Sequence, residues 1–346
     1  MNEVRPLPAG DCLVTGATGL VGNNVVRQLV AAGRRVRVLV RTGGSEADRV
    51  FAGLPVIRCY GSVDDDDALR IAAEGCGAII HSAAMVHSGW WHLDAMRRTN
   101  VDGTRTVARA ARLVGARMVH VSSVDAGGLR SDGAPADEET PAGGMLECPY
   151  VVTKREAEEA LREEIDRGLD AVIVNPVYML GPWDWKPSSG RMLLIVGSGR
   201  GLFAPPGSND FVDVRDVAAG ILAALERGRV GRRYILGGHP LSYLDAWRTF
   251  ATVAGCRPPR GIAPVPLARF AGRVGDLAAL LLRREPDLNS AAVGMSLLAH
   301  NFSCTRARKE LGYAFRDFES TVRDAWAWFM SHGYIGESRQ RSAAAR

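Results

Sequence analysis

The stretch Thr15-Gly16-Ala17-Thr18-Gly19-Leu20-Val21-Gly22 decides the fold, because it joins a short apolar run to an amphipathic helical pattern. Cys12-Leu13-Val14 precedes it, and the helical pattern from Val21 to Ala32 ends at Gly33. A strand, a glycine-rich turn and a helix in this order are typical of the phosphate-binding unit of dinucleotide-binding folds. The alternative interpretation is an ordinary glycine turn, and the strand–turn–helix context favours the dinucleotide site.

Each glycine of this turn has an expected physical role. Gly16 permits the tight turn, Gly19 lets the backbone approach a pyrophosphate, and Gly22 permits close helix–strand packing. The phosphates would then lie at the helix N-terminus, where backbone N–H groups point outward. We therefore predict cofactor contacts along the whole turn, from Gly16, Thr18, Gly19, Leu20, Val21 and Gly22.

Short apolar runs and helical patterns alternate through the first half of the chain. The runs are VRVLV at 36–40, VIRC at 56–59, AIIH at 78–81, MVHV at 118–121 and AVIV at 171–174. Such near-continuous apolar strands are buried on both faces, which is typical of a parallel sheet. Helical patterns cover 97–113 and 150–167. We therefore predict an α/β fold with a Rossmann-like, doubly wound parallel sheet.

The pattern changes after Pro176, where residues 181–210 become rich in Gly, Pro and Ser. A helix over 214–227 and a strand over 234–236 follow, and then mostly helical segments. We predict a cofactor domain over 1–180, to which 211–240 returns. The segments 181–210 and 241–336 would form a smaller, mainly helical substrate lobe, and 337–346 a disordered tail.

Composition excludes several classes of protein. The 346 residues carry a net charge of +5, and only three of the 43 basic residues are lysines. The arginines are scattered among acids, so no nucleic acid partner is expected. The six cysteines are far apart and form no C-x-x-C pair, which predicts no metal site and a reducing cytoplasm. The N-terminus has no apolar signal core, and no apolar run reaches the roughly 18 residues of a spanning helix.

The residue after the second predicted strand bears on the choice of cofactor. An acid there would accept hydrogen bonds from the adenosine ribose of NAD, but the sequence has Arg41, followed by Thr42 and a Gly-Gly-Ser run. A cation and hydroxyls suit a 2′-phosphate. The alternative is a solvated arginine in an arginine-rich chain. We predict NADP(H) as the preferred cofactor, with NAD(H) as the second candidate.

A second signal is Tyr150-Val151-Val152-Thr153-Lys154, in which Tyr150 and Lys154 are four residues apart on a predicted helix. Positions i and i+4 share a helix face, so phenol and ammonium can enter one pocket. A nearby cation favours the phenolate and lowers the pKa of a phenol from about 10. Ser123, at the end of the run before it, can supply a hydroxyl to the same substrate oxygen.

These motifs resemble an extended short-chain dehydrogenase/reductase of the NAD-dependent epimerase/dehydratase family. The resemblance covers nearly the whole chain. It rests on TGATGLVG at 15–22, HSAA at 81–84, TNVDGT at 99–104, HVSS at 120–123, YVVTK at 150–154, VNPVYMLGP at 174–182, FVDVRDVA at 211–218 and residues 305–313.

The resemblance implies roles for individual residues. Tyr150 would be the acid/base, Lys154 would bind the nicotinamide ribose and lower the pKa of Tyr150, and Ser123 would be the catalytic hydroxyl. Asn100 would kink its helix beside the active site. The remaining implied cofactor contacts are Ala83 and Ala84 at the ribose, Pro176 and Val177 at the nicotinamide, and Ser62 and Val63 at the adenine. The family usually has Gly-Asp where this chain has Gly61-Ser62.

Three branches of the family differ at diagnostic positions. The 4,6-dehydratases need an acid directly after the catalytic hydroxyl, where this chain has Val124. Sugar-nucleotide epimerases keep NAD bound and usually carry an acid where Arg41 stands. Dihydroflavonol reductase-like proteins and 3-beta-hydroxysteroid dehydrogenases often have such an arginine, and the segment 180–191 is similar to the group called hopanoid-associated sugar epimerases. We therefore predict interconversion of a ketone and a secondary alcohol, with nucleotide-sugar epimerisation and a non-catalytic NADP-binding role as alternatives.

Aromatic residues in the predicted lobe indicate an apolar small molecule. Trp90, Trp91, Trp183 and Trp185 follow the strands over which a substrate would lie, and they suit a fused-ring or polyketide-like molecule better than a diphosphate. The alternative is that these tryptophans pack the lobe interface. The predicted substrate contacts are Met85, His87, Ser123, Asp125, Tyr178 and Trp183.

Residues 264–282 form an apolar-faced helical pattern with Arg269 and Arg273. Such a helix could rest weakly on a membrane surface, or it could cap the substrate pocket. The resemblance also implies a homodimer through the helices at 97–114 and 150–167.

Overall fold

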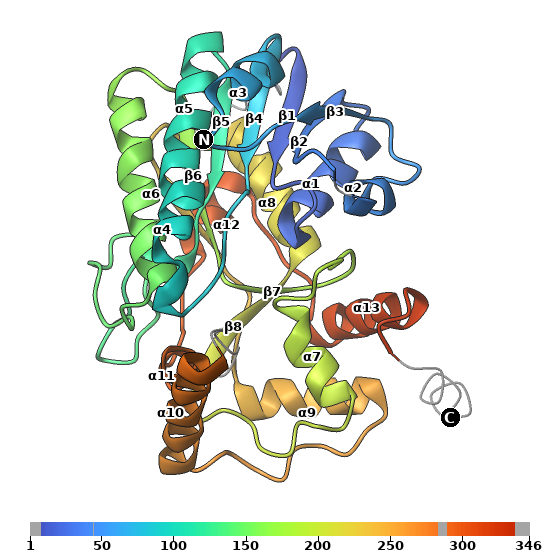
Figure 1. Cartoon of the computed structure of the whole chain (residues 1–346), viewed down its shortest axis with the longest axis vertical. Coiled ribbons are helices and arrows are strands. Elements are labelled where there is room, and N and C mark those ends of the chain that lie inside the picture. Colours follow the sequence, from blue (N-terminus) through green and yellow to red (C-terminus); the bar gives the residue numbers. More distant parts are fainter. Residues whose placement is uncertain (1–7, 44, 283–288, 336–346) are drawn as a thin grey trace.

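The computed structural model describes residues 8–43, 45–282 and 289–335. Its main sheet has seven strands in the order β3-β2-β1-β4-β5-β6-β9, and every neighbouring pair is parallel (Figure 1). The strands are β1 (Asp11–Thr15), β2 (Val36–Val40), β3 (Val56–Tyr60), β4 (Cys76–His81), β5 (Arg117–Val121), β6 (Ala171–Pro176) and β9 (Arg233–Leu236). The predicted doubly wound fold is confirmed.

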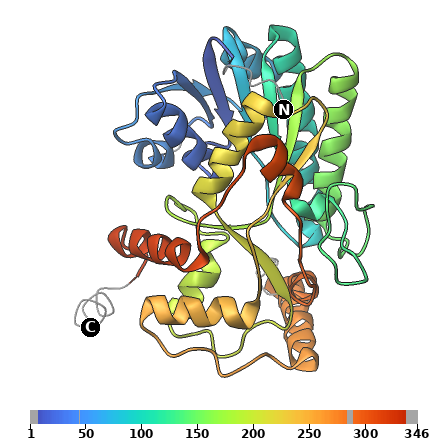
Figure 2. The same ribbon diagram turned by 180° about the vertical axis from the view of Figure 1, so that it is seen from behind.

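Helices cover both faces of this sheet, as Figures 1 and 2 show from opposite sides. One layer contains α3 (Asp66–Ala73), α5 (Gly103–Val114) and α6 (Pro149–Asp166), and the other contains α1 (Leu20–Ala31) and α8 (Val214–Arg227). The short helices α2 (Ser45–Val50), α4 (Leu93–Met96) and α12 (Thr305–Leu311) complete this part.

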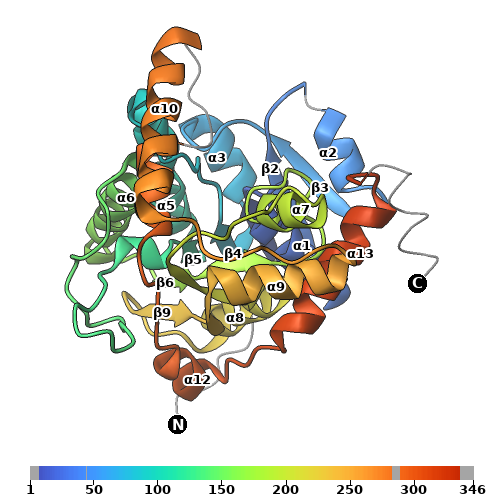
Figure 3. The same cartoon turned by 90° about the horizontal axis from the view of Figure 1, so that it is seen from below.

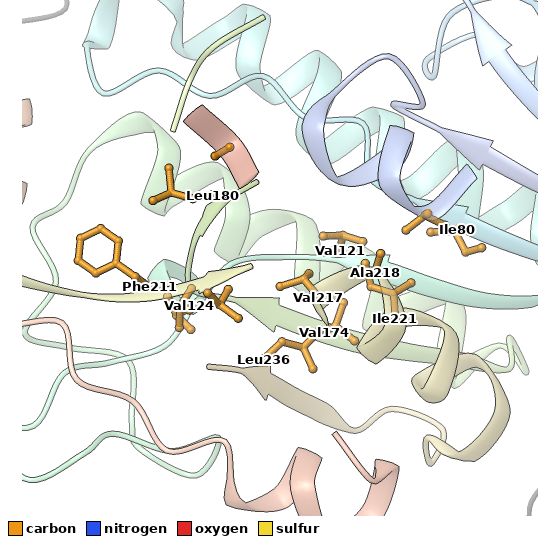
Figure 4. Close-up of a cluster of buried hydrophobic side chains, with 14 of the residues drawn as sticks. Ile80, Val121, Val124, Val174, Leu180, Phe211, Val217, Ala218, Ile221 and Leu236 are labelled. Atoms are coloured by element: carbon orange, nitrogen blue, oxygen red, sulfur yellow. The ribbon is translucent and has the colours of Figure 1, made fainter. Parts of the chain in front are cut away.

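Apolar side chains that alternate in direction along the strands build two hydrophobic cores, one on each face of the main sheet. Ile80, Val121 and Val174 face α8, where Val217 and Ile221 pack against them (Figure 4). Their strand neighbours Ile79, Met118 and Ile173 point the other way, toward Val107 of α5 and Leu161 of α6. Successive strand residues alternate between faces, so a run that is apolar throughout is buried by helices on both sides.

The second part of the molecule lies beyond the carboxyl ends of the strands (Figure 1). It contains helices α7 (Gly190–Gly197), α9 (Tyr243–Ala254), α10 (Val265–Leu282), α11 (Ser290–Ser296) and α13 (Phe318–Ser331). It also contains a three-stranded sheet in the order β10-β8-β7, formed by β7 (Tyr178–Leu180), β8 (Ser208–Asp213) and β10 (His239–Ser242). The sequence did not predict this sheet, because its strands are short and two of them carry mostly polar or proline-interrupted sequence.

Within the described residues, no helix is long and apolar enough to cross a membrane. The predicted tail at 337–346 lies outside the described residues.

Candidate active site

The glycine turn between β1 and α1 has no room for side chains at two of its positions. Gly16 has a φ of +68°, and a Cβ there would lie 2.5 Å from the backbone nitrogen of Ala83. A Cβ on Gly22 would lie 2.4 Å from the carbonyl oxygen of Gly16. Only glycine fits such a close approach of backbone to backbone. The turn therefore lies directly against the segment that follows β4.

The start of α1 is open to an anion. Gly19 is its N-cap and provides no side-chain cap, and the first turn contains no acidic residue. The first N–H groups of a helix have no partner within the helix, so they can bind a phosphate. The residues present fit the pyrophosphate of a dinucleotide.

The other predicted cofactor residues lie along the same edge of the sheet. Arg41 directly follows β2 and is exposed. Ser62 and Val63 follow β3. Val63 packs closely on Gly103, because a Cβ on Gly103 would lie 2.7 Å from the Cγ2 of Val63. The remaining four are Ala83 and Ala84 after β4, and Pro176 and Val177 at the end of β6.

The three predicted catalytic side chains come together where β5 meets α6. Ser123 follows β5 and is the N-cap of the short turn Val124–Ala126, while Tyr150 and Lys154 share one face of α6. The Lys154 Nζ lies 5.9 Å from the centroid of the Tyr150 ring and donates a hydrogen bond to the carbonyl oxygen of Val121 at 3.1 Å. Pro149 at the start of α6 fixes the backbone that positions both side chains.

Burial controls the ionisation of this group. Burial raises the pKa of Tyr150 above its ordinary value, and the Asp125 carboxylate raises it further, while a hydrogen bond with Ser123 acts in the opposite direction. Burial lowers the pKa of Lys154 to about 8, although the charges of Glu158 and Asp125 oppose this shift. The expected lowering of the Tyr150 pKa is therefore wrong for this structure, because burial and the Asp125 carboxylate raise this pKa, while the Lys154 ammonium donates its hydrogen bond to Val121.

Asn100 connects two predicted parts of the site. It lies in a π-helical segment, Arg97–Asp102, which interrupts the helical run before α5. Its side chain donates to the carbonyl oxygen of Met85 at 3.0 Å and accepts from the Met85 N–H at 2.7 Å. It also donates to Thr153 of α6 at 3.0 Å. A wider helical turn at a functional position is typical of π-bulges, and here it lets one amide hold Met85 next to α6.

The Asp125 carboxylate lies between the two parts of the molecule. It accepts a hydrogen bond from the Ser123 hydroxyl at 3.3 Å, and it lies 3.7 Å from the Nε2 of His300, which is buried in the lobe. Burial raises the pKa of Asp125, although the neighbouring His300 and Ser123 oppose the shift. The sequence analysis did not identify His300, because no motif marks a histidine 175 positions away from its partner.

Glu158 is a second residue that the sequence analysis missed. Its carboxylate is fully buried one helical turn after Lys154. It accepts from the Ser122 hydroxyl at 2.6 Å, from the Asn175 amide at 2.9 Å and from the Arg233 Nε at 2.7 Å. The Asn175 amide also donates to the carbonyl oxygen of Ser123 at 2.8 Å. This network fixes the backbone at Ser123, and its signal in the sequence is an acid at i+4 from Lys154 on a buried helix face.

Replacing Glu158 by alanine is expected to lower the free energy of unfolding by about 3–5 kcal/mol, because it leaves a partly buried arginine without its charge partner. Urea denaturation measures this change. Glu156→Ala is the matched control, because Glu156 lies on the same helix and pairs with the exposed Arg97. Exposed ion pairs contribute little to stability, so equal losses in the two variants would contradict the structural role of Glu158.

The predicted substrate residues separate into two groups. Met85 and His87 follow β4 on the Asn100 side, where His87 packs edge-on against His92. Tyr178 donates its hydroxyl hydrogen to the carbonyl oxygen of Ser189 and packs on Phe211 of the lobe sheet. Trp183 lies 3.2 Å from the Arg27 guanidinium of α1 and joins a cluster with Trp185 and Trp328. Trp183 and Trp185 thus pack between α1 and α13, as in the alternative considered for the tryptophans.

Comparisons with known proteins agree with this geometry. The family model described as the NAD dependent epimerase/dehydratase family matches residues 12–237. The chain is 36% identical over 337 residues to a putative dihydroflavonol 4-reductase of Synechocystis, which covers 94% of this chain and 96% of that protein. It is 35% identical over 327 residues to sterol demethylase protein B of Methylococcus capsulatus, which covers 93% and 99% respectively.

A solved structure is similar over the same length. The crystal structure of gox2253 matches with a TM-score of 0.83 at 37% identity, and the match covers 94% of this chain and 100% of that chain. The glycine turn, the strand order and these matches confirm the family resemblance. The protein belongs to the NAD-dependent epimerase/dehydratase family and is an NAD(P)-dependent oxidoreductase of the extended short-chain dehydrogenase/reductase type.

Proposed function

We propose that the protein interconverts a ketone and a secondary alcohol on an apolar, fused-ring or polyketide-like small molecule, with NADP(H) as cofactor. The observation that carries this proposal is the convergence of buried Ser123 and Lys154 with partly buried Tyr150, next to a glycine turn suited to a dinucleotide. A bound nicotinamide would supply the hydride for reduction, or accept it in the reverse direction.

The chain's own residues would handle the proton and the oxygen. The Tyr150 hydroxyl donates its proton to the carbonyl oxygen while the carbonyl carbon takes up hydride, so the products are an alcohol and the oxidised cofactor. The Ser123 hydroxyl donates a hydrogen bond to the same oxygen and stabilises its developing negative charge. The raised pKa of Tyr150 keeps the phenol protonated at neutral pH, which suits the reductive direction.

The apolar substrate class is supported by the surroundings of Met85. The segment after it carries Trp90 and Trp91, each about half exposed. Together with α10 and α11 these tryptophans line a pocket with a volume of about 320 Å³. Two of the similar proteins are named for a dihydroflavonol and a sterol, which are fused-ring molecules. We therefore choose a dihydroflavonol, a 3-ketosteroid and a decalone as the first test substrates.

The preference for NADP(H) is supported by Arg41, which is exposed at the end of β2 where an adenosine 2′-phosphate would lie. We expect Arg41→Asp to weaken NADPH binding by roughly tenfold to a hundredfold and to improve NADH binding, because a charge-assisted hydrogen bond contributes about 1.5–3 kcal/mol. Isothermal titration with both cofactors measures the change. Arg70→Asp, on exposed α3, is the control, and an unchanged preference in the Arg41 variant would contradict the proposal.

The epimerase alternative makes a different prediction about the purified protein. An epimerase recycles a tightly held oxidised cofactor, so acid denaturation should release stoichiometric NAD. The segment Asn175-Pro176-Val177 resembles the phosphate-contacting loop of sugar-nucleotide epimerases, but the Asn175 amide donates to the Glu158 carboxylate and to the carbonyl oxygen of Ser123. We expect little retained nucleotide, with stabilisation by added NADPH exceeding that by NADH in a thermal shift. Stoichiometric NAD would overturn the proposed function.

A further inference from the structure

Helix α10 carries an apolar stripe on its outer surface. Its members are Leu267, Phe270, Val274 and Leu277, and their side chains are 56%, 63%, 50% and 57% exposed respectively. Residues three and four apart are neighbours on a helix, so this spacing places all four on one face over three turns. Figure 3 shows that α10 stands at the edge of the molecule.

The packing of the opposite face of α10 explains why the stripe points outward. Gly272, Gly275 and Ala279 are buried, and α10 packs with this small-residue face on α11. A Cβ on Gly272 would lie 3.0 Å from the Cα of Ser290, so the two backbones are in close contact. The inner side also supplies Asp276 and Ala279 to the pocket beside Trp90 and Trp91. The inner face of α10 thus lines a pocket, and Leu267, Phe270, Val274 and Leu277 remain outside.

Charged residues beside the stripe are cationic. Arg269 and Arg273 are exposed, and Arg273 is a helical neighbour of both Phe270 and Leu277. Neither arginine forms an ion pair with any residue in the part of the chain that the structure describes. The one acid in this part of α10, Asp276, accepts a hydrogen bond from the Ser290 N–H on the α11 side. Among the described residues, the stripe therefore lies next to two arginines that have no acidic partner.

The apolar surface continues beyond the start of the helix. Ile262, Leu202 and Phe203 are each about half exposed. Backbone hydrogen bonds from Arg260 to Leu202 and from Ala204 to Gly261 hold these two segments side by side. Residues 202–203 and Ile262 thus form an exposed apolar group, in which Ile262 shortly precedes α10 in the chain, and this group and the α10 stripe are together called the apolar surface.

We propose that this surface docks on an anionic phospholipid bilayer, with α10 lying in the plane of the interface. Leu267, Phe270, Val274 and Leu277 would enter the boundary of the acyl chains, while Arg269 and Arg273 extend to the phosphates. An exposed apolar stripe flanked by arginines is typical of helices that lie in a membrane interface. Docking would leave the pocket between α10, α11 and Trp90 behind α10, about one helix diameter from the bilayer.

Vesicle co-sedimentation of the full-length protein tests this proposal. The probes are vesicles of phosphatidylcholine alone and vesicles with about one third phosphatidylglycerol. We expect binding to the anionic vesicles to exceed binding to the neutral ones by roughly tenfold or more, because each arginine near an anionic surface contributes about 1 kcal/mol. The Phe270→Glu, Leu277→Glu double variant should lose at least tenfold in binding, and Arg273→Glu should lose affinity for anionic vesicles only.

Ile71→Glu is the matched control, because Ile71 is 60% exposed on α3, which belongs to the other part of the molecule. Thermal melting with and without NADPH shows whether each variant is folded. The proposal is overturned if the wild-type protein binds neither vesicle, or if the α10 variants bind as the wild type does. It is also overturned if the double variant instead converts a dimer into a monomer, since the stripe would then contact a second copy. None of these readouts uses ketone reduction, so failure here and failure of the proposed function are distinguishable.

Discussion

Replacing Tyr150 by phenylalanine is expected to lower kcat for ketone reduction by about a hundredfold to ten-thousandfold, while NADPH binding stays nearly unchanged. The range is that of general acid catalysis, and the substitution removes the proposed proton donor without removing the ring. The phenol is partly buried and its raised pKa keeps it protonated, so it is suited to protonate the substrate oxygen at neutral pH. Steady-state kinetics and calorimetric NADPH binding measure the two effects separately.

Tyr243→Phe is the matched control for this variant. Tyr243 is a more deeply buried tyrosine than Tyr150, and its phenol oxygen accepts a hydrogen bond from Asn209 in the lobe. The Tyr243→Phe variant should keep most of the activity, because the Tyr243 hydroxyl forms a structural hydrogen bond in the lobe. Full turnover in Tyr150→Phe would remove Tyr150 from the proposed mechanism.

Replacing Lys154 by methionine is expected to reduce both NADPH affinity and kcat, because the ammonium would contact the ribose and polarise the site around Tyr150. The pKa of Lys154 is lowered to about 8 by burial, so the wild-type ammonium is present below this pH and is lost above it. We therefore expect wild-type kcat/KM for reduction to fall as the pH rises through about 8. A pH profile of kcat/KM reports groups of the free enzyme and tests this directly.

The methionine variant should lack this alkaline fall, since it has no group that titrates at position 154. Lys154→Arg provides the complementary control, because it keeps a positive charge at all of these pH values but has a different shape. It should also lack the fall and have a lower rate throughout. A wild-type profile that is flat to pH 10, or a fall that persists in both variants, would contradict the role assigned to Lys154.

The parallel sheet could be predicted because its first turn and its strands each carry a local sequence pattern. The glycines of the 15–22 turn are required by contacts at Gly16 and Gly22 that leave no space for a Cβ. Apolar runs predicted the buried strands because helices cover both faces. The strands of the lobe sheet are three to six residues long, and no such pattern marks them.

The site was predictable where its residues belong to local motifs. Tyr150 and Lys154 share a helix face by spacing alone, and Ser123 ends a strand. His300 and Arg233 were missed because they reach Asp125 and Glu158 only through the tertiary fold. The prediction of a lowered Tyr150 pKa was also wrong. The extent of burial, which sets this pKa, depends on the whole surrounding structure and cannot be inferred from spacing. The outward orientation of the α10 stripe likewise depends on how Gly272 packs against α11.

The most direct test of the central claim is hydride transfer from NADPH deuterated at C4 to a ketone. The purified protein is incubated with this cofactor and each of the three test ketones, and the alcohol is analysed by mass spectrometry and NMR. We expect one deuterium at the carbinol carbon, one NADP formed for each alcohol, and loss of the transfer in Tyr150→Phe. Oxidised NAD released in stoichiometric amount from the protein, with no deuterium transferred to any of the ketones, would contradict it.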